Sequence, residues 1–242
     1  MSGMQRKIAV IGANGFVGSQ ICRAIDLIPK YSLIKILRES NLSDGIKQAD
    51  IIIHAANPAG RFRAESNPEQ DFSATVDKTY EILSHCGDKK LVLISSLSCR
   101  TQMNINYGRN RRMCELLALA AHGTVVRLGP MFGIGRTRDT LHDILEGRQV
   151  FVSATTRYGY VNVEWAGSEI VRLLGSSSDL YEVGARDSIS LAEIAEYFGS
   201  ISKFSGLDDS QFLEGNDIGP SARKVIRYAS EELENQDWKS EK

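Results

Sequence analysis

A glycine-rich segment near the start of the chain has a spacing that suits an anionic ligand. Gly12-Ala13-Asn14-Gly15-Phe16-Val17-Gly18 directly follows the apolar run 8–11. Between a strand and a helix, the first glycine permits a tight turn, the second lets the backbone approach a pyrophosphate, and the third allows close packing of helix and strand. The free N–H groups and the dipole at the helix N-terminus favour the anion. The segment predicts a nicotinamide dinucleotide site; a glycine-rich loop without a ligand is the alternative.

The choice between NAD and NADP depends on the residues that follow the second expected strand. Arg38 stands there, with Glu39 beside it. An acidic residue at this position binds the ribose 2′-hydroxyl of NAD, whereas an arginine accommodates the 2′-phosphate of NADP, because a guanidinium matches a phosphate with two hydrogen bonds. Arg38 therefore favours NADP, and a solvated pair of opposite charges is the alternative.

The charge composition gives no indication of a nucleic-acid partner. The 242 residues include 29 basic and 30 acidic side chains, for a formal net charge of -1, so the basic excess of a nucleic-acid-binding domain is absent. No apolar run approaches the ~20 residues of a membrane helix, and the N-terminus leads into the first strand without a signal segment. We expect a cytoplasmic globular protein with no nucleic-acid or membrane partner.

The cysteines and histidines are not spaced like metal ligands. Cys22, Cys86, Cys99 and Cys114 form no C-x-x-C pair and are expected to be reduced, mostly buried thiols. His54 stands at the end of the third expected strand, close to the expected cofactor, and we expect a structural rather than a catalytic role for it. No metal is predicted.

Strand-like and helix-like segments alternate along the chain, which predicts an α/β fold of the Rossmann type with a doubly wound parallel sheet. Short apolar runs, typical of strands buried on both faces, alternate with helical patterns over most of the chain. The expected strands are 8–11, 33–37, 51–54, 91–94, 124–128 and 160–163, the expected helices are 17–28, 69–85, 106–121, 140–146 and 166–174, and two small elements follow at 181–183 and 191–198.

One strand–helix unit of the usual dinucleotide fold is expected to be missing or shortened. Only about a dozen residues separate the second strand from the third, and a crossover with its helix needs at least ~10–12 residues. A helix, a further strand and a second helix cannot all fit between them.

The pattern also predicts a division of the chain into regions. Residues 1–135 are expected to form the dinucleotide-binding Rossmann domain, and 136–229 a small C-terminal substrate lobe interleaved with the last Rossmann elements. Residues 230–242 are mostly polar and are expected to end as a surface helix or a frayed tail.

Six segments share the order and spacing of one family's motifs. They are the glycine turn at 12–18, Asp50 to Ala56, Ser95 to Ser98, Tyr107 to Glu115, and the stretches 127–135 and 161–166. Together they resemble the extended short-chain dehydrogenases/reductases, the NAD-dependent epimerase/dehydratase family of nucleotide-sugar enzymes. The fourth segment is similar to the family's Y-G-x-S-K motif, and Arg111 stands where the family has the lysine.

The resemblance implies a catalytic set. In the family the tyrosine is the general acid/base on the sugar hydroxyl or carbonyl, the lysine holds the nicotinamide ribose and lowers the tyrosine pKa, and a serine or threonine binds the same substrate oxygen. By position, Tyr107 is the acid/base, Arg111 supplies the cation, and Ser96 supplies the hydroxyl, with Ser98 as second choice. A phenol, with a pKa of ~10 in isolation, becomes useful near neutrality beside a cation.

The resemblance also implies which residues contact the cofactor and the substrate. The expected cofactor contacts are Gly12, Asn14, Gly15, Phe16, Val17, Gly18, Arg38, Ala55, Ala56, Ser95, Tyr107, Arg111 and Gly129. Ser98 and Arg157 are expected to contact the substrate, with the arginine on its diphosphate.

The arginine at position 111 leaves two functional interpretations open. Tyr107 and Arg111, at i and i+4, share one helix face. An arginine can still lower the tyrosine pKa and donate to ribose hydroxyls, but it cannot take part in a proton relay by losing a proton. The alternative to a working enzyme is therefore a catalytically weakened NAD(P)-binding protein with a sensing or assembly role.

Two segments that are short for this family indicate which reaction to expect. The region past Gly135 is short for a nucleotide-sugar enzyme, and the path from Leu37 to Asp50 is similar to that of dTDP-4-dehydrorhamnose reductase-like members of the family. We therefore expect an NAD(P)-dependent oxidoreductase acting on a sugar carbonyl or hydroxyl, with 4-keto reduction of a nucleotide sugar favoured. A nucleotide-sugar epimerase is the alternative, and a homodimer is common in the family.

Overall fold

The structure is a computed structural model that describes residues 5–136, 138–215 and 217–240. The chain divides into two compact units. Unit 1 contains the residues up to Leu128 together with Glu164–Val183, and unit 2 contains Gly129–Val163 and the residues from Gly184 onward. The first boundary falls after Leu128, earlier than the position 135 expected from the sequence, because the segment that follows pairs within unit 2.

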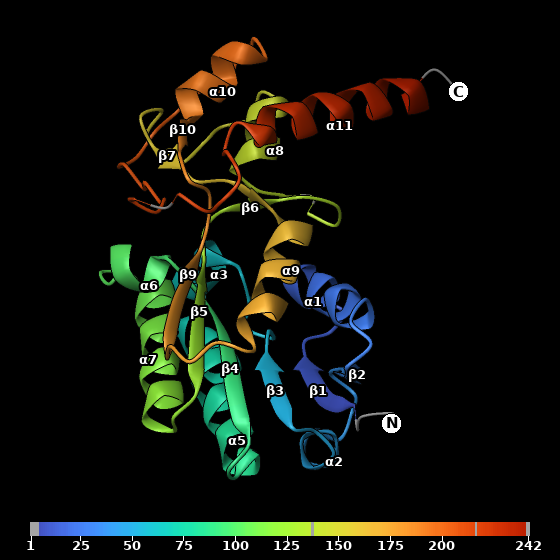
Figure 1. The fold of residues 1–242 in the computed structure, drawn as a ribbon. Helices are drawn as coiled ribbons and strands as arrows, with labels where there is room; N and C mark the ends of the chain where they lie inside the picture. The colour runs from blue at the N-terminus through green and yellow to red at the C-terminus, as the bar shows by residue number, and fades with distance from the viewer. Residues whose placement is uncertain (1–4, 137, 216, 241–242) are drawn as a thin grey trace. The chain divides into compact units, whose positions relative to one another are not determined.

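A parallel sheet of six strands forms the centre of unit 1 (Figure 1). Its order is β2-β1-β3-β4-β5-β9, and every neighbouring pair is parallel. The strands are β1 (Arg6–Ile11), β2 (Tyr31–Ile36), β3 (Ile51–His54), β4 (Lys90–Ser96), β5 (Thr124–Leu128) and β9 (Leu180–Val183). The Rossmann-type α/β fold predicted from the sequence is confirmed.

The sheet ends at β2, where the sequence predicted a missing strand–helix unit. Only the short helix α2 (Leu42–Lys47) lies between β2 and β3, and β3 returns to pair with β1. Asn41 caps α2 by accepting a hydrogen bond from the Asp44 amide at 3.2 Å, as asparagine does at helix N-termini. A further strand outside β2 is therefore replaced by one short helix.

Helices cover both faces of this sheet. Helices α1 (Phe16–Asp26) and α9 (Val163–Leu173) lie side by side, since a Cβ on Gly167 would lie 2.8 Å from the Gln20 carbonyl carbon (Figure 1). Helices α5 (Lys78–Cys86) and α7 (Asn106–Ala120) pack with α2 against the other face. Fully buried apolar side chains fill that interface: Ala9, Ile52, Leu93 and Val125 from the strands, and Ile46, Ile82, Cys114 and Ala118 from the helices.

The expected single helix over 69–85 consists of three pieces in the structure. They are α4 (Pro68–Phe72), a π-helical turn at Ser73–Asp77, and α5. The hydroxyl of Thr75 donates to the Asp71 carbonyl at 2.6 Å, and that of Thr79 donates to the Thr75 carbonyl at 2.8 Å. Threonine hydroxyls that bond to the preceding turn distort a helix in this way, which an apolar periodicity does not reveal.

Unit 2 consists of small elements. Strand β6 (Met131–Phe132) pairs with β8 (Val161–Asn162), and β7 (Arg157–Tyr158) pairs with β10 (Ile189–Ser190). The helices are α8 (Thr140–Leu145), α10 (Leu191–Tyr197) and α11 (Lys224–Ser240). Helix α11 includes most of the segment 230–242, so a helix is observed there up to Ser240; residues 241–242 lie outside the described residues. Over the described part of the chain, no helix has the length and apolar character needed to cross a membrane.

A buried ion pair joins α7 to the sheet in unit 1. Glu115 is fully buried, and its two carboxylate oxygens accept from the Nε and Nη2 atoms of Arg127, on β5, at 2.9 and 2.7 Å. The hydroxyl of Ser95, on β4, donates to the same carboxylate at 2.7 Å. Two of the sequence motifs therefore meet as a bidentate pair that fixes the helix on its strands.

Removal of one partner should destabilise unit 1 strongly. Arg127→Ala leaves the Glu115 carboxylate buried without its main counter-charge, so we expect a loss of about 3–5 kcal/mol in the free energy of unfolding. Lys78→Ala is the control, because the Lys78–Glu81 pair is exposed and an exposed pair contributes about 1 kcal/mol or less. Urea denaturation of both variants measures the difference; equal losses would contradict this account.

Candidate functional site

The glycine turn lies directly against the end of β3. Gly12 has a φ of +83°, and a Cβ on it would lie 2.8 Å from both the Ala55 carbonyl oxygen and the Ala56 Cα. The Gly12 amide donates to the Ile36 carbonyl at 3.2 Å, which ties the turn to the end of β2. Only glycine fits a position with this φ and this clearance. The predicted residues Gly12, Ala55 and Ala56 are thus in contact.

The turn continues directly into the N-terminus of α1. Gly15 is the N-cap residue, makes no side-chain cap, and its own amide donates to the Gly12 carbonyl at 2.9 Å. A Cβ on Gly18 would lie 2.1 Å from that carbonyl oxygen, so the third glycine is required for the helix to start here. The first turn of α1, which includes Phe16 and Val17, carries no acidic residue. Such a helix N-terminus suits an anion.

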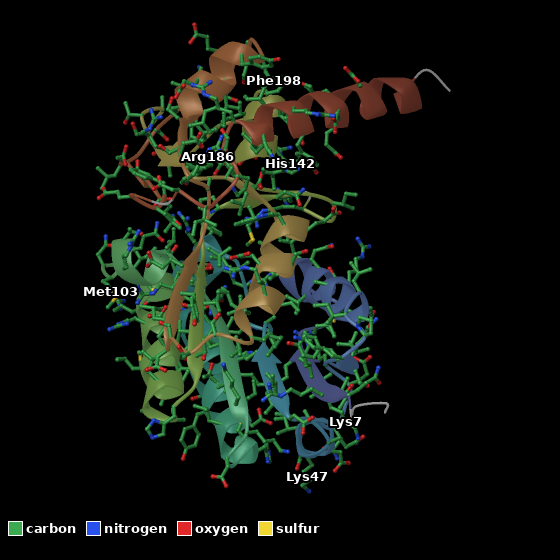
Figure 2. The ribbon with its side chains drawn as sticks, in the orientation of Figure 1. Lys7, Lys47, Met103, His142, Arg186 and Phe198 are labelled. Carbon is green, nitrogen blue, oxygen red and sulfur yellow. The ribbon has the colours of Figure 1, made fainter. Side chains whose placement is uncertain are left out.

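The other predicted residues of unit 1 gather at the same edge of the sheet. β1, β3 and β4 are neighbours and parallel, so the turn after β1, the loop after β3 and the serines at the end of β4 lie along one edge. Figure 2 shows Met103, in the loop that leads to α7, toward this end of unit 1, with Lys7 and Lys47 at the other. Ligands of open parallel sheets bind at this carboxyl edge.

Tyr107 and Arg111 face each other on α7, as their spacing predicted. Tyr107 is 8% exposed and Arg111 only 3% exposed, and the guanidinium carbon lies 4.7 Å from the centre of the tyrosine ring. The Nη2 atom of Arg111 donates to the carbonyl of Pro58, in the loop after β3. Its Nη1 atom is buried and has no hydrogen-bond partner among the described residues. The arginine therefore connects α7 to the loop at the carboxyl edge of the sheet.

The pKa of the Tyr107 phenol is lowered, so the phenol ionises more readily. Burial raises its pKa, but the charges of Arg111 and Arg61 and hydrogen bonds with Arg111 and Ser96 lower it by more. The pKa of Tyr107 therefore lies below its ordinary value. This is the direction that a proton-transferring tyrosine requires.

The three serines at the end of β4 have different surroundings. Ser96 hydrogen-bonds with Tyr107, and its hydroxyl also donates to that of Ser98 at 3.2 Å. Ser95 points to the opposite face of the sheet, where its hydroxyl is held by Glu115, as the alternation along a strand requires. The structure thus brings Ser96, Ser98 and Tyr107 together. Because the Ser95 side chain is held by Glu115, the predicted cofactor contact of Ser95 could be made only by its main chain.

His54 has the surroundings of a structural residue, in line with the sequence-based expectation. It is fully buried, and burial, with the charges of Arg111 and Lys78, lowers its pKa to about 3. Its Nδ1 accepts from the Ala56 amide at 3.3 Å, and its Nε2 lies 3.2 Å from the Thr79 hydroxyl. Because that hydroxyl donates elsewhere, we assign the proton to Nε2. The neutral ring holds the loop after β3.

Helix α3 (Arg61–Ser66) contributes a residue that the sequence did not indicate. The carboxylate of Glu65 accepts from the Asn106 amide at 2.7 Å, the Asn106 side chain at 3.2 Å and the Tyr107 amide at 3.4 Å. Ile105, the N-cap residue of α7, provides no side-chain cap. An acid from another helix therefore caps the helix that carries Tyr107, and its charge suits the helix dipole.

Three predicted residues lie apart from this cluster or outside unit 1. Arg38 is exposed, two residues past the end of β2. Gly129 and Arg157 belong to unit 2, where the Arg157 guanidinium donates to the Ser188 hydroxyl at 3.0 Å and the Ser188 carbonyl at 2.8 Å, and pairs with Glu193. Their assigned ligand contacts remain predictions.

The cysteines are buried and unpaired. Cys22, Cys86, Cys99 and Cys114 are all free thiols inside the protein, as expected. Within the residues that the structure describes, no group of three or more histidine, cysteine or acidic side chains is arranged to hold a metal ion.

Comparison with known proteins identifies the N-terminal part of the chain. The model of the NAD dependent epimerase/dehydratase family matches residues 8–103, which contain the glycine turn, the loop after β3 and the serines of β4. The family resemblance predicted from the sequence is therefore confirmed over this segment. Tyr107 and Arg111 lie just beyond it. Among curated proteins, no sequence relative was found.

Solved structures share the fold over nearly the whole chain. An NAD-dependent NDP-hexosamine 5,6-dehydratase, TunA, involved in tunicamycin biosynthesis, has a TM-score of 0.80 at 13% identity, covering 96% of this chain and 98% of its own. UDP-glucuronic acid 4-epimerase from Bacillus cereus has a TM-score of 0.71 at 17% identity, covering 92% and 93%. dTDP-4-dehydrorhamnose reductase from Bacillus anthracis has a TM-score of 0.73 at 16% identity, covering 96% and 100%. At these identities the likeness concerns the fold.

The helix cap formed by Glu65 should contribute measurably to the free energy of unfolding. Glu65→Ala removes the acceptor of two α7 amides, so we expect the free energy of unfolding to fall by about 1 kcal/mol. Glu65→Gln keeps an acceptor oxygen and should lose less. Glu39→Ala, an exposed acid in a turn, is the control and should change stability by less than about 0.5 kcal/mol. A Glu65→Ala value equal to that control would show that the cap contributes nothing.

Proposed function

We propose that this chain is an NAD(P)-dependent oxidoreductase that reduces a keto group of a nucleotide sugar. Among such groups, the 4-keto group is the favoured substrate. The observation that carries the proposal is the cluster of Ser96, Tyr107 and Arg111 at the carboxyl edge of the sheet, beside the glycine turn. The family match over residues 8–103 supports a nicotinamide cofactor. The names of the structures that share the fold support nucleotide sugars as the substrate class.

The residues of unit 1 fit a dinucleotide. The turn at Gly12 presents backbone without side chains, and the dipole at the N-terminus of α1 favours a pyrophosphate. The unpartnered Nη1 atom of Arg111 is a buried donor, and buried donors in native proteins are normally satisfied. A ribose hydroxyl would satisfy it. When bound, the nicotinamide supplies or accepts a hydride at a sugar carbon.

The chain's own residues handle the oxygen and its proton. In the reductive direction, the phenol of Tyr107 gives its proton to the carbonyl oxygen as the hydride arrives at carbon, which yields an alcohol and leaves a phenolate. Ser96 fixes the same oxygen through its hydroxyl. Arg111 remains charged throughout and stabilises the phenolate. The lowered pKa of Tyr107 thus makes its anion easier to form.

Loss of the phenol should remove turnover without removing cofactor binding. Tyr107→Phe keeps the ring under Arg111 but has no proton to give, so we expect the rate of 4-keto sugar reduction to fall by about 10²–10⁴-fold. In the wild type, reduction should decline as pH rises through the lowered pKa of Tyr107, because the phenol form is required, and alcohol oxidation should increase over the same range. Steady-state oxidation of NADH or NADPH measures the reduction, and steady-state formation of NADH or NADPH from the oxidised cofactor measures the alcohol oxidation.

Controls separate this proposal from its alternatives. Tyr107→Phe must still bind NAD(P)H by fluorescence titration, weakened by no more than about tenfold, the value of the one hydrogen bond that the phenol can give the cofactor. Full reductase activity in this variant would refute the mechanism. Wild-type protein that binds cofactor but turns over no 4-keto sugar would favour the sensing or assembly role, and conversion of a sugar without net cofactor consumption would favour an epimerase.

Arg38 should determine the choice of cofactor. Its exposed guanidinium follows β2, whose end is tied to the glycine turn, so we expect it to bind a 2′-phosphate. Arg38→Ala should weaken NADPH binding by about 10–100-fold, the value of a hydrogen bond to a charged group, and leave NADH binding unchanged. Arg38→Lys should retain part of the NADPH affinity. Tighter binding of NADH than NADPH by the wild type would refute this role.

A further inference from the structure

The carboxamide of Asn57 is buried without a partner. Both its Oδ1 and its Nδ2 atoms are shielded from solvent, and neither has a hydrogen bond to any described residue. Native proteins satisfy nearly all buried polar side-chain atoms, so an amide that lacks both partners requires an explanation. Neither the sequence motifs nor the catalytic set assigned a role to this residue.

Asn57 lies between two parts of the cofactor edge. On its N-terminal side, Ala56 packs against Gly12, where a Cβ would approach the Ala56 Cα to 2.8 Å. On its C-terminal side, the Pro58 carbonyl accepts from Arg111. The Nη1 atom of the same arginine is the second buried polar atom here without a partner. The Asn57 amide and the Arg111 Nη1 atom, both without a hydrogen-bond partner among the described residues, thus belong to the segments that connect the glycine turn with Tyr107.

The chemistry of these groups selects the ligand. The Asn57 amide offers one acceptor and two donors, and Arg111 offers a further donor. A vicinal diol matches this set, because each hydroxyl can both donate and accept. In a dinucleotide whose pyrophosphate lies on the glycine turn, the group that continues toward Tyr107 is the ribose attached to the nicotinamide. We infer that Asn57 binds the hydroxyls of this ribose; the inference rests on the proposed cofactor.

Ligands of graded length can test this assignment. ADP ends at the diphosphate, ADP-ribose adds the second ribose, and NADH adds the nicotinamide, with 2′-phosphorylated counterparts to be used if the chain prefers NADPH. Calorimetric titration of Asn57→Ala should show ADP-ribose and NADH bound about tenfold or more weakly, the loss expected for one or two hydrogen bonds, and ADP bound as by the wild type.

Two further variants control for structure. Asn57→Asp keeps the shape but loses the amide donors, so it should also weaken ADP-ribose while sparing ADP. Asn67→Ala, an exposed asparagine of the same unit, should change no affinity. Pro58 already restricts residue 57 to extended backbone, so neither substitution at that position requires a new main-chain conformation.

The outcomes are distinct. Unchanged ADP-ribose affinity in both Asn57 variants would mean that water satisfies the amide and would overturn the inference. An equal loss for ADP would also overturn it, because the residue would then only support the turn. Wild-type protein that binds neither NADH nor NADPH would refute the proposed cofactor itself, whereas tight wild-type binding with unaffected variants would refute the role of Asn57 alone.

Discussion

The buried positive charge of Arg111 is the constraint on which the site depends. The side chain is 3% exposed, and its Nη2 donates to a carbonyl, that of Pro58, rather than to a carboxylate. A buried charge without a carboxylate partner is costly, so its surroundings must accommodate it. The Tyr107 ring lies beneath it and its phenol has a lowered pKa, while the pKa of His54 falls to about 3. Arg111 thus favours ionisation of the phenol, and it adds to burial, the larger cause, in keeping His54 neutral.

The geometry explains what an arginine can do where the family has a lysine. The guanidinium lies over the Tyr107 ring and still directs one nitrogen to the loop after β3 and another into buried space. An ammonium is a point charge and could not make the ring contact and the directed contacts in the same way. The arginine cannot give up its proton, so any proton that Tyr107 releases must be replaced through hydroxyl groups or water. The two other roles proposed for Arg111, to position the cofactor and to stabilise the phenolate, require only its positive charge and its N–H donors.

Sequence patterns predicted the parts of this site that are local. The glycine spacing predicted the turn, the short gap before β3 predicted the missing strand, and the i, i+4 spacing predicted the contact of Tyr107 with Arg111. Glu65 escaped prediction because it reaches α7 from 41 residues away in the chain, and no periodicity encodes such a contact. Asn57 escaped because a single polar residue after a strand has no pattern; only its buried, unpartnered amide distinguishes it.

Helix α7 is held from several directions, which makes Tyr107, the proposed acid/base, part of the rigid scaffold. Glu115 bonds to Arg127 on β5 and to Ser95 on β4, Glu65 holds the first amides, and Arg111 reaches the loop after β3. Catalytic groups held by rigid elements keep their geometry better than groups on loops. Ser95 and Ser96 show how this arises, because adjacent residues of a strand face opposite ways. Ser95 binds the helix to the sheet through Glu115, and Ser96, the next residue, hydrogen-bonds with Tyr107 of the same helix.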